Sequence, residues 1–263
     1  MKILFIGDIV GKIGRKTVTR LLPKIKKRNK IDFCIANGEN AAHGYGMTEI
    51  TAKEMMDAGV DFFTLGDHSF KRMSQIDVLS KFPAIRPANF PPDVPGKGYK
   101  VVTVNNYKVL IINLIGRVFM KRSYDCPFRE ADKILANFAK EKLSAIIIDI
   151  HAEATSEKIT LKNYLDGRIS AIFGTHTHVM TADQQITKKG TAYITDAGMC
   201  GYADGSIGID SKSIIKTFFT EIEYPHVIPE NGRTIFNGII VDINPKTAKA
   251  ESITPIIEYT NIK

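Results

Sequence analysis

Two histidines, His176 and His178, stand two positions apart where the apolar run from Ile169 to Phe173 gives way to Gly174. Alternate residues of an extended chain point to the same side, and imidazole is a common metal ligand, so both rings can face one cation. Such pairs also occur without a metal, because alternate strand residues share a face for many reasons. The pair therefore indicates a metal site only when further ligands accompany it.

Three other apolar runs end in polar side chains of the same kind. They lead into Gly7-Asp8, Gly66-Asp67-His68 and His151. A lone Asp or His in such a position is more often a turn former or a helix cap. However, sites in α/β proteins lie at the carboxyl ends of strands, and four of the six histidines fall there. Together with the acidic Glu39, the joint pattern predicts a metal-dependent site.

The donor types narrow the class of metal. The candidate donors are the carboxylates and imidazoles of Asp8, Glu39, Asp67, His68, His151, His176 and His178. With no thiolate among them, they suit catalytic Mn, Fe, Zn or Co better than a structural zinc. They also outnumber the three or four protein ligands of one zinc. Two metals that share a carboxylate account for the surplus, and a pair about 3.5–4 Å apart stabilises both the attacking and the leaving oxygen in phosphoester cleavage.

These motifs, in this order, resemble those of the calcineurin-like metallophosphoesterases. Longer stretches are similar to the bacterial YmdB family of cyclic-nucleotide phosphodiesterases, from Met1 to about Ile243: NGENAAH from Asn37, RPANFP from Arg86, HAEATSEK from His151 and GTHTHVMTAD from Gly174. The resemblance implies an α/β fold, a four-layer α/β/β/α metallophosphoesterase sandwich in which helices flank two mixed sheets.

The resemblance also implies two sets of metal ligands that share the acid Glu39. The first metal takes Glu39 together with Asp8, His178 and the neighbouring Asn40. The second metal takes Glu39 together with Asp67, His151 and His176. The metals implied are two divalent or mixed-valence ions, Fe or Mn before Zn, Co or Mg.

His68 resembles the catalytic histidine of the family, which protonates the leaving oxygen or stabilises the transition state. General acid catalysis of this kind typically contributes about 10²–10⁴-fold to the rate. Asp67 is a departure, because the family usually has Asn there. Its carboxylate binds a hard cation more strongly than an amide does, but it adds negative charge where an anionic phosphodiester must approach.

The function implied by the resemblance is a dinuclear phosphodiesterase that hydrolyses 2′,3′-cyclic nucleotides, or other small phosphodiesters, by attack of a metal-activated hydroxide. The ring would open at its 2′ oxygen and leave a 3′-phosphate. The alternative is an RNA-associated regulatory protein with structural or sensory metals and weak phosphodiesterase activity. The departure at Asp67 keeps this alternative open.

The pattern of apolar runs predicts how the strand ends are brought together. Runs at about 2–7, 31–36 and 60–65 are separated by segments such as Thr48 to Ala58, whose apolar residues recur at near-helical spacing. This alternation favours βαβ units and a mainly parallel sheet. Parallel strands place their carboxyl ends along one edge, where the predicted ligands would meet.

The middle of the chain predicts the start of a second sheet. Two β-rich runs between Tyr99 and Leu114 flank Asn105-Asn106, which suits a hairpin turn. A helix is expected over Phe128 to Leu143, followed by the ligand-bearing strands at 145–150 and 169–173.

The last third predicts another hairpin. Ser213 to Ile222 and Thr234 to Ile243 flank Glu230 to Arg233, a strong turn signal. With a last strand near 249–258, these segments are expected to complete the second sheet. The sequence has no evident linker, repeat or low-complexity segment, so residues 1–263 are expected to form a single domain.

Residues outside the main motifs are weaker candidates. Arg86 or Asn89, in a proline-rich loop, could contact a substrate phosphate, although a purely structural loop is the alternative. His43 lies near Glu39 in sequence and could influence the site, whereas His226 is expected to be structural.

Composition agrees with a globular enzyme: 44% of the 263 residues are hydrophobic and 24% are charged. The first apolar run is too short for a signal peptide, and none reaches the roughly 20 residues of a membrane span. The three cysteines are sparse, which suits a reducing compartment, and Cys34 is expected in the core. We therefore expect a cytoplasmic protein outside the membrane, and a homo-oligomer is compatible with these features.

The net charge of +8 favours polyanionic partners at long range. Its densest cluster lies between Lys24 and Lys30, after a predicted first helix. Cations at a helix C-terminus complement the helix dipole, so a solvated helix end is the first explanation and an RNA-binding patch is the second. No aromatic residues are interspersed in the cluster, which argues against a stacking platform for single strands.

Overall fold

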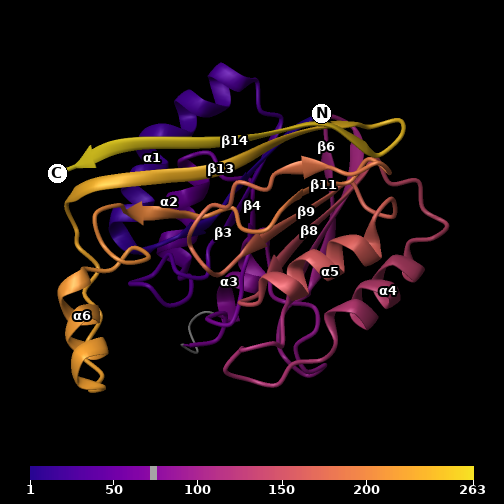
Figure 1. Ribbon diagram of the computed structural model, residues 1–263. Coiled ribbons are helices and arrows are strands. Elements are labelled where there is room, and N and C mark those ends of the chain that lie inside the picture. Colours follow the sequence, from indigo (N-terminus) through magenta and orange to yellow (C-terminus); the bar gives the residue numbers. More distant parts are fainter. Residues whose placement is uncertain (72–75) are drawn as a thin grey trace.

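The computed structural model describes residues 1–71 and 76–263. Two mixed sheets pack face to face, and helices cover the outer face of each (Figure 1). This is the four-layer arrangement implied by the sequence resemblance, and that prediction is confirmed. Within the described part of the chain, none of the helices has the length and apolar character that crossing a bilayer requires.

The first sheet carries the predicted N-terminal ligands. In the described residues its strand order is β2-β12-β13-β1-β3-β4-β5, and β14 pairs with β13. The strands are β1 (Lys2–Ile6), β2 (Asp8–Ile9), β3 (Phe33–Asn37), β4 (Phe62–Thr64), β5 (Ala84–Ile85), β12 (Met199–Tyr202), β13 (Gly232–Asn244) and β14 (Lys249–Ile262). Strands β1, β3 and β4 are parallel, as the βαβ pattern predicted, and β5 is parallel to β4, whereas β13 runs antiparallel to β1.

The second sheet carries the histidines and has the order β10-β11-β9-β8-β7-β6 among the described residues. Its strands are β6 (Tyr99–Val104), β7 (Tyr107–Ile115), β8 (Ala145–His151), β9 (Ala171–Thr175), β10 (Gln185–Ile186) and β11 (Ala192–Ile194). Strands β6 and β7 form the predicted hairpin, and both turn residues have positive φ, 47° at Asn105 and 69° at Asn106. Asparagine tolerates this conformation well, which explains the turn.

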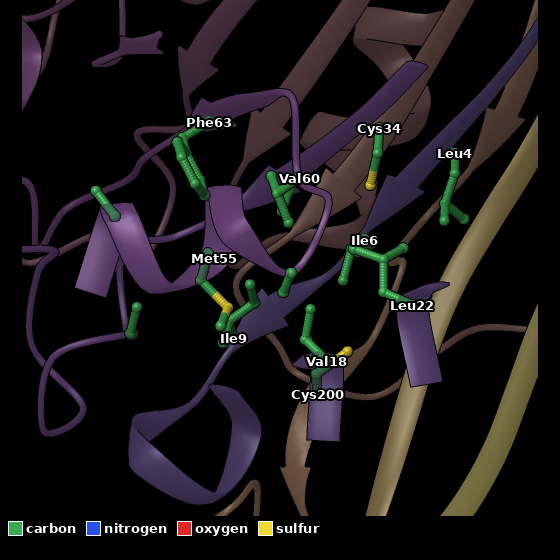
Figure 2. Close-up of a cluster of buried hydrophobic side chains, with 14 of the residues drawn as sticks. Leu4, Ile6, Ile9, Val18, Leu22, Cys34, Met55, Val60, Phe63 and Cys200 are labelled. Atoms are coloured by element: carbon green, nitrogen blue, oxygen red, sulfur yellow. The ribbon is translucent and has the colours of Figure 1, made fainter. Parts of the chain in front are cut away.

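The two sheets and the helices on their outer faces enclose three apolar layers. On the first sheet lie α1 (Gly11–Asn29), α2 (Glu49–Asp57) and α3 (Ile76–Lys81), and on the second lie α4 (Pro127–Asn137) and α5 (Thr155–Leu165). Figure 2 shows the layer under α1 and α2, where Leu22 and Met55 meet β1 residues such as Ile6 and where Cys34 is buried, as predicted. Between the sheets, the rings of Phe5 and Phe173 stack at 4.8 Å.

The sequence prediction was wrong for the segment Ser213 to Ile222. Residues Ser211–Thr220 form the helix α6, capped by Asp210, whose side chain accepts a hydrogen bond from the Lys212 backbone N–H. The apolar residues of this segment recur at three- and four-residue spacing, which is the period of a helix. In Figure 1, α6 extends away from the body of the molecule.

Two further expectations also need correction. Strand β13 forms its hairpin with β14, and this hairpin joins the first sheet beside β1 instead of completing the second. Pairing between distant strands is set by tertiary packing, which a local pattern does not encode. The helix expected over Phe128 to Leu143 ends at Asn137.

Candidate metal centre

The predicted ligands converge where the two sheets meet, at the carboxyl ends of their strands. Asp8 follows β1, Glu39 follows β3, Asp67 follows β4, His151 ends β8 and His176 follows β9. One donor atom each from Glu39, Asp67, His151 and His176 lies within 4.8 Å of the others. The strand-end pattern therefore brings together side chains that are up to 137 positions apart in sequence.

One half of this cluster, here called the His151 side, consists of Asp67, His151 and His176 around the shared Glu39. The Nε2 atom of His151 lies 3.1 Å from Oε1 of Glu39 and 3.3 Å from Oδ1 of Asp67. The Nδ1 atom of His176 lies 3.0 Å from the same Nε2 atom. These are the residues expected around the second metal.

The other half, the Asn40 side, consists of Asp8, Asn40 and His178 around Glu39. The amide nitrogen of Asn40 lies 3.4 Å from Oδ1 of Asp8, 3.3 Å from Oε1 of Glu39 and 3.2 Å from Nε2 of His178. The carboxylate of Asp8 and the ring of His178 are themselves 3.8 Å apart. The residues expected around the first metal thus surround one amide group.

Hydrogen bonds outside the cluster fix which ring nitrogen faces it. Nδ1 of His151 donates to the hydroxyl of Thr175 at 2.9 Å, because that hydroxyl itself donates to Asp149 at 2.7 Å. Nδ1 of His178 donates to the carbonyl of Ile207 at 3.0 Å. Both histidines therefore keep Nε2 for the cluster, the arrangement that metal-binding histidines need.

The sequence reasoning missed these supporting residues. Asp149 is fully buried, and burial raises its pKa to about 6. It also accepts a hydrogen bond from Asn37, whose side-chain oxygen accepts from the backbone N–H of Glu39. One signal was present in the sequence: Asp149 precedes His151 by two positions, so both lie on one face of β8.

The electrostatics of the cluster fit a cation. Burial alone would lower the pKa of His151, but the adjacent carboxylates of Glu39 and Asp67 raise it well above the ordinary value. Despite its own burial, Asp67 has a pKa below its usual range because His151 bonds to it and is charged. A proton on His151 thus balances buried carboxylate charge, which a bound metal ion would balance instead. Burial and the charge of His151 lower the pKa of His176 to about 4, so its ring is neutral at pH 7.

His68 lies beside the cluster. Its Nδ1 atom is 2.9 Å from the side-chain oxygen of Asn40, and its backbone N–H donates to Oε2 of Glu39 at 3.1 Å. The preceding Gly66 allows this approach, since a Cβ atom there would lie 2.1 Å from Oε2 of Glu39. The ring of His68 is partly exposed and lies edge-on to Tyr45, so it can reach a molecule outside the cluster.

A cavity of about 650 Å³ opens over the cluster and includes Glu39, Asn40, His68, His176 and His178 in its wall. Elsewhere its wall combines apolar side chains with charged ones of both signs, among them Tyr45, Ile207, Lys121, Glu153 and Glu230. His43 and His226 also line it, although His226 was expected to be only structural. The volume is in the range of small-molecule sites.

The suggestion that Arg86 or Asn89 contacts substrate is not supported. The Arg86 guanidinium donates to the carbonyl oxygens of Pro87 and Val94 within its own loop. Asn89 donates to the carbonyl of Ile115 and accepts from the N–H of the same residue. Both are buried and stabilise the loop, which is the alternative given above.

Comparison with known proteins agrees with this geometry. A protein of Bacillus subtilis named 2′,3′-cyclic-nucleotide 2′-phosphodiesterase is 47% identical over 258 residues, 98% of this chain and 97% of the relative. A crystal structure of a Thermus thermophilus protein described as hypothetical has a TM-score of 0.91 at 37% identity, covering 98% of this chain and 99% of that one.

A second solved structure extends the comparison. A Mycoplasma pneumoniae protein described as a novel phosphatase has a TM-score of 0.92 at 32% identity, covering 99% of this chain and 94% of that one. The family model described as YmdB-like protein matches residues 4–256, nearly the whole chain. Sequence, fold and strand-end cluster therefore lead to one conclusion: the chain belongs to the family of YmdB-like proteins.

Proposed function

We propose that this protein is a metal-dependent phosphodiesterase that hydrolyses 2′,3′-cyclic nucleotides to 3′-nucleotides. The observation that carries the proposal is the buried cluster of carboxylates and imidazoles beneath a cavity of about 650 Å³. The name of the Bacillus subtilis relative supports the substrate class. A nucleotide has the size and the mixed polar and apolar character that this cavity accepts.

Two metal ions would be held by the two sides described above. Asp8, Asn40 and His178 would hold one, Asp67, His151 and His176 the other, and Glu39 would bridge them. Fe or Mn suits these oxygen and nitrogen donors best, with Zn, Co or Mg as alternatives. Bound there, the ions would lower the pKa of a water molecule and neutralise charge on the phosphodiester.

His68 would act at the leaving oxygen. Nδ1 donates to the side-chain oxygen of Asn40, so the proton would come from Nε2 of the protonated ring, which lies 3.6 Å from Oδ2 of Asp67. As water oxygen bonds to phosphorus, the bond from phosphorus to the 2′ oxygen breaks, and the proton from His68 would neutralise that oxygen. Lys121 in the cavity wall would attract the anionic substrate, whereas Lys12 is paired with Glu230 at 2.7 Å.

The proposal is tested with protein purified without chelator and analysed for metal. The protein should contain two metal ions per chain and convert 2′,3′-cyclic AMP to 3′-AMP, while the Glu39→Gln variant serves as the inactive control. Product identity is read by chromatography against 2′-AMP and 3′-AMP standards. Release of 2′-AMP would contradict the assignment of the leaving oxygen, and no turnover with two metals bound would contradict the activity.

The RNA-associated alternative finds less support in the basic cluster. Lys26 pairs with Asp61 at 2.8 Å and Arg28 pairs with Glu258, and both cations lie in the last turn of α1. These contacts favour the explanation of a helix end over that of a nucleic-acid surface. Binding of a single-stranded RNA oligomer to the metal-free protein would revive the alternative.

We further propose that residues 1–263 act as one domain, because the apolar layer between the sheets joins residues from the start, middle and end of the chain. Self-association stays a prediction that α6 supports. None of its described residues is buried, and Phe218 and Phe219 are 78% and 86% exposed. Light scattering gives the molar mass that tests it. A cytoplasmic location also stays a prediction.

A further inference from the structure

The segment from His176 to His178 has an unusual backbone. His176 has a φ of 101° and His178 a φ of 65°, in the region that residues with a side chain rarely adopt. Such conformations persist only where the surrounding contacts impose them. The contacts of Thr177, the residue between them, hold the segment in this conformation.

Thr177 is held by a single carboxylate. Oδ2 of Asp196 accepts the backbone N–H of Thr177 at 3.1 Å and its hydroxyl at 2.8 Å. The other oxygen, Oδ1, accepts the N–H of Gly198 at 2.8 Å, and the carbonyl of Gly198 accepts the N–H of Asp8 at 3.0 Å. Asp196 thus connects the histidine segment with the backbone of Asp8, across the point where the chain passes from β11 to β12.

Lys158 balances the charge of Asp196. Its Nζ atom lies 2.9 Å from Oδ2, and the two side chains are 1% and 0% exposed. Lys158 lies near the N-terminus of α5, where the helix dipole disfavours a cation. A buried ion pair also adds little stability by itself, because desolvation offsets its attraction. Helix and folding energetics therefore do not account for a lysine at this position.

We propose that Lys158 and Asp196 are a positioning pair that sets the left-handed backbone of His176 and His178, and the place of Asp8, before a metal binds. Neither residue is among the candidate ligands or in the cavity wall. The inference rests on the proposed function, because the histidines need this geometry only if they hold metal. Loss of the pair should weaken metal binding most on the Asn40 side, because both Asp8 and His178 depend on Asp196 for their position.

The test separates the effect of the Asp196 hydrogen bonds on ligand position from the effect of its buried charge. Lys158→Met leaves an uncompensated buried carboxylate, whereas the double variant Lys158→Met with Asp196→Asn is neutral. An Asn has one acceptor oxygen, which cannot replace the bonds to both Thr177 and Gly198. In the metal-free state, we expect the double variant to have the same midpoint of thermal unfolding as the unchanged protein. Its metal affinity on the Asn40 side should nevertheless be lower by about 10–100-fold, the usual cost of losing a hydrogen bond to a ligand.

Metal affinities are measured by titrating Mn²⁺ into metal-free protein, which needs no activity. The matched control is Lys162→Met, which removes another buried lysine of α5 that lies over the Tyr193 ring instead of beside Asp196. It should bind both metals as the unchanged protein does. Thr177→Val, which removes only the hydroxyl bond, should weaken the same site by a smaller factor.

Two results have different meanings. If the unchanged protein binds fewer than two metals, the proposed function itself fails. If it binds two and the double variant binds both with unchanged affinity, the pair is only structural and the inference is overturned.

Discussion

The two sides of the candidate metal centre differ in what lies at their middle. On the His151 side it is an imidazole ring whose pKa is raised by the carboxylates of Glu39 and Asp67. On the Asn40 side it is the Asn40 amide, surrounded by three acceptors. A metal ion must therefore displace the proton of His151 on one side and rotate the side-chain amide of Asn40 on the other. The comparison shows that one cluster can prepare two sites by different chemistry.

The largest effect should come from the residue that both sides share. Oε1 of Glu39 lies 3.1 Å from His151 and 3.3 Å from the Asn40 amide. Glu39→Gln removes charge from both sides at once, so metal content should fall to one or none per chain and turnover should be abolished. Circular dichroism should show that the fold is kept. A fully active variant with two metals would refute the bridging role and, with it, the comparison.

His68 serves neither side as a ligand in the proposal. His68→Ala should therefore keep both metals and lower kcat by about 10²-fold or more, the scale of a lost general acid. A nitrophenyl phosphodiester should suffer less, because nitrophenolate leaves without a proton. Equal losses on good and poor leaving groups would contradict protonation, and loss of one metal would make His68 a ligand.

Asp67→Asn changes one ligand of the His151 side and none of the Asn40 side, although Asp67 also lies 3.6 Å from Nε2 of His68. The carboxylate holds the second metal more tightly but repels the incoming phosphodiester, so the variant should gain about tenfold in kcat/KM, roughly 1.4 kcal/mol of transition-state stabilisation. A chelator should strip metal from the His151 side more easily and leave the Asn40 side unchanged. Lower activity together with tighter metal binding would show that the sign of the charge argument is wrong.

The smallest effect is the proton that the metal on the His151 side releases. His151 has a raised pKa and carries a proton at neutral pH in the metal-free protein, so binding there should release about one proton and strengthen as pH rises. His176, with its pKa lowered to about 4, adds none at pH 7. Calorimetry in buffers of different ionisation enthalpy counts these protons. Equal release from both sides would remove the distinction between them.

The candidate site could be read from the sequence because each ligand follows an apolar run. The ends of β1, β4, β8 and β9 were evident from short patterns that do not depend on distant pairing. The supporting residues were not evident, because Asp149 and Lys158 look like ordinary strand and helix residues. Only the fold brings Lys158 within 2.9 Å of Asp196.

The errors in the fold share a related cause. The segment that forms α6 is apolar enough for a strand, and the turn signal near Gly232 suggested a partner for it. The spacing of Ile214, Ile215, Phe218 and Phe219 could have identified the helix. The pairing of β13 with β1 could not have been found in this way, since it joins segments from opposite ends of the chain.

That last pairing has a consequence for synthesis. β1 has Lys2 opposite Asp242 and Ile6 opposite Gly238, and Asp8 is held by the carbonyl of Gly198. The position of Asp8, the first ligand in the chain, therefore depends in part on a strand that is translated near the end. Domains are translated in minutes or less but fold as units, and contacts this distant form late. A ribosome-bound chain that stops before Gly232 should consequently bind metal more weakly on the Asn40 side, so that uptake of both metals marks the completion of the polypeptide.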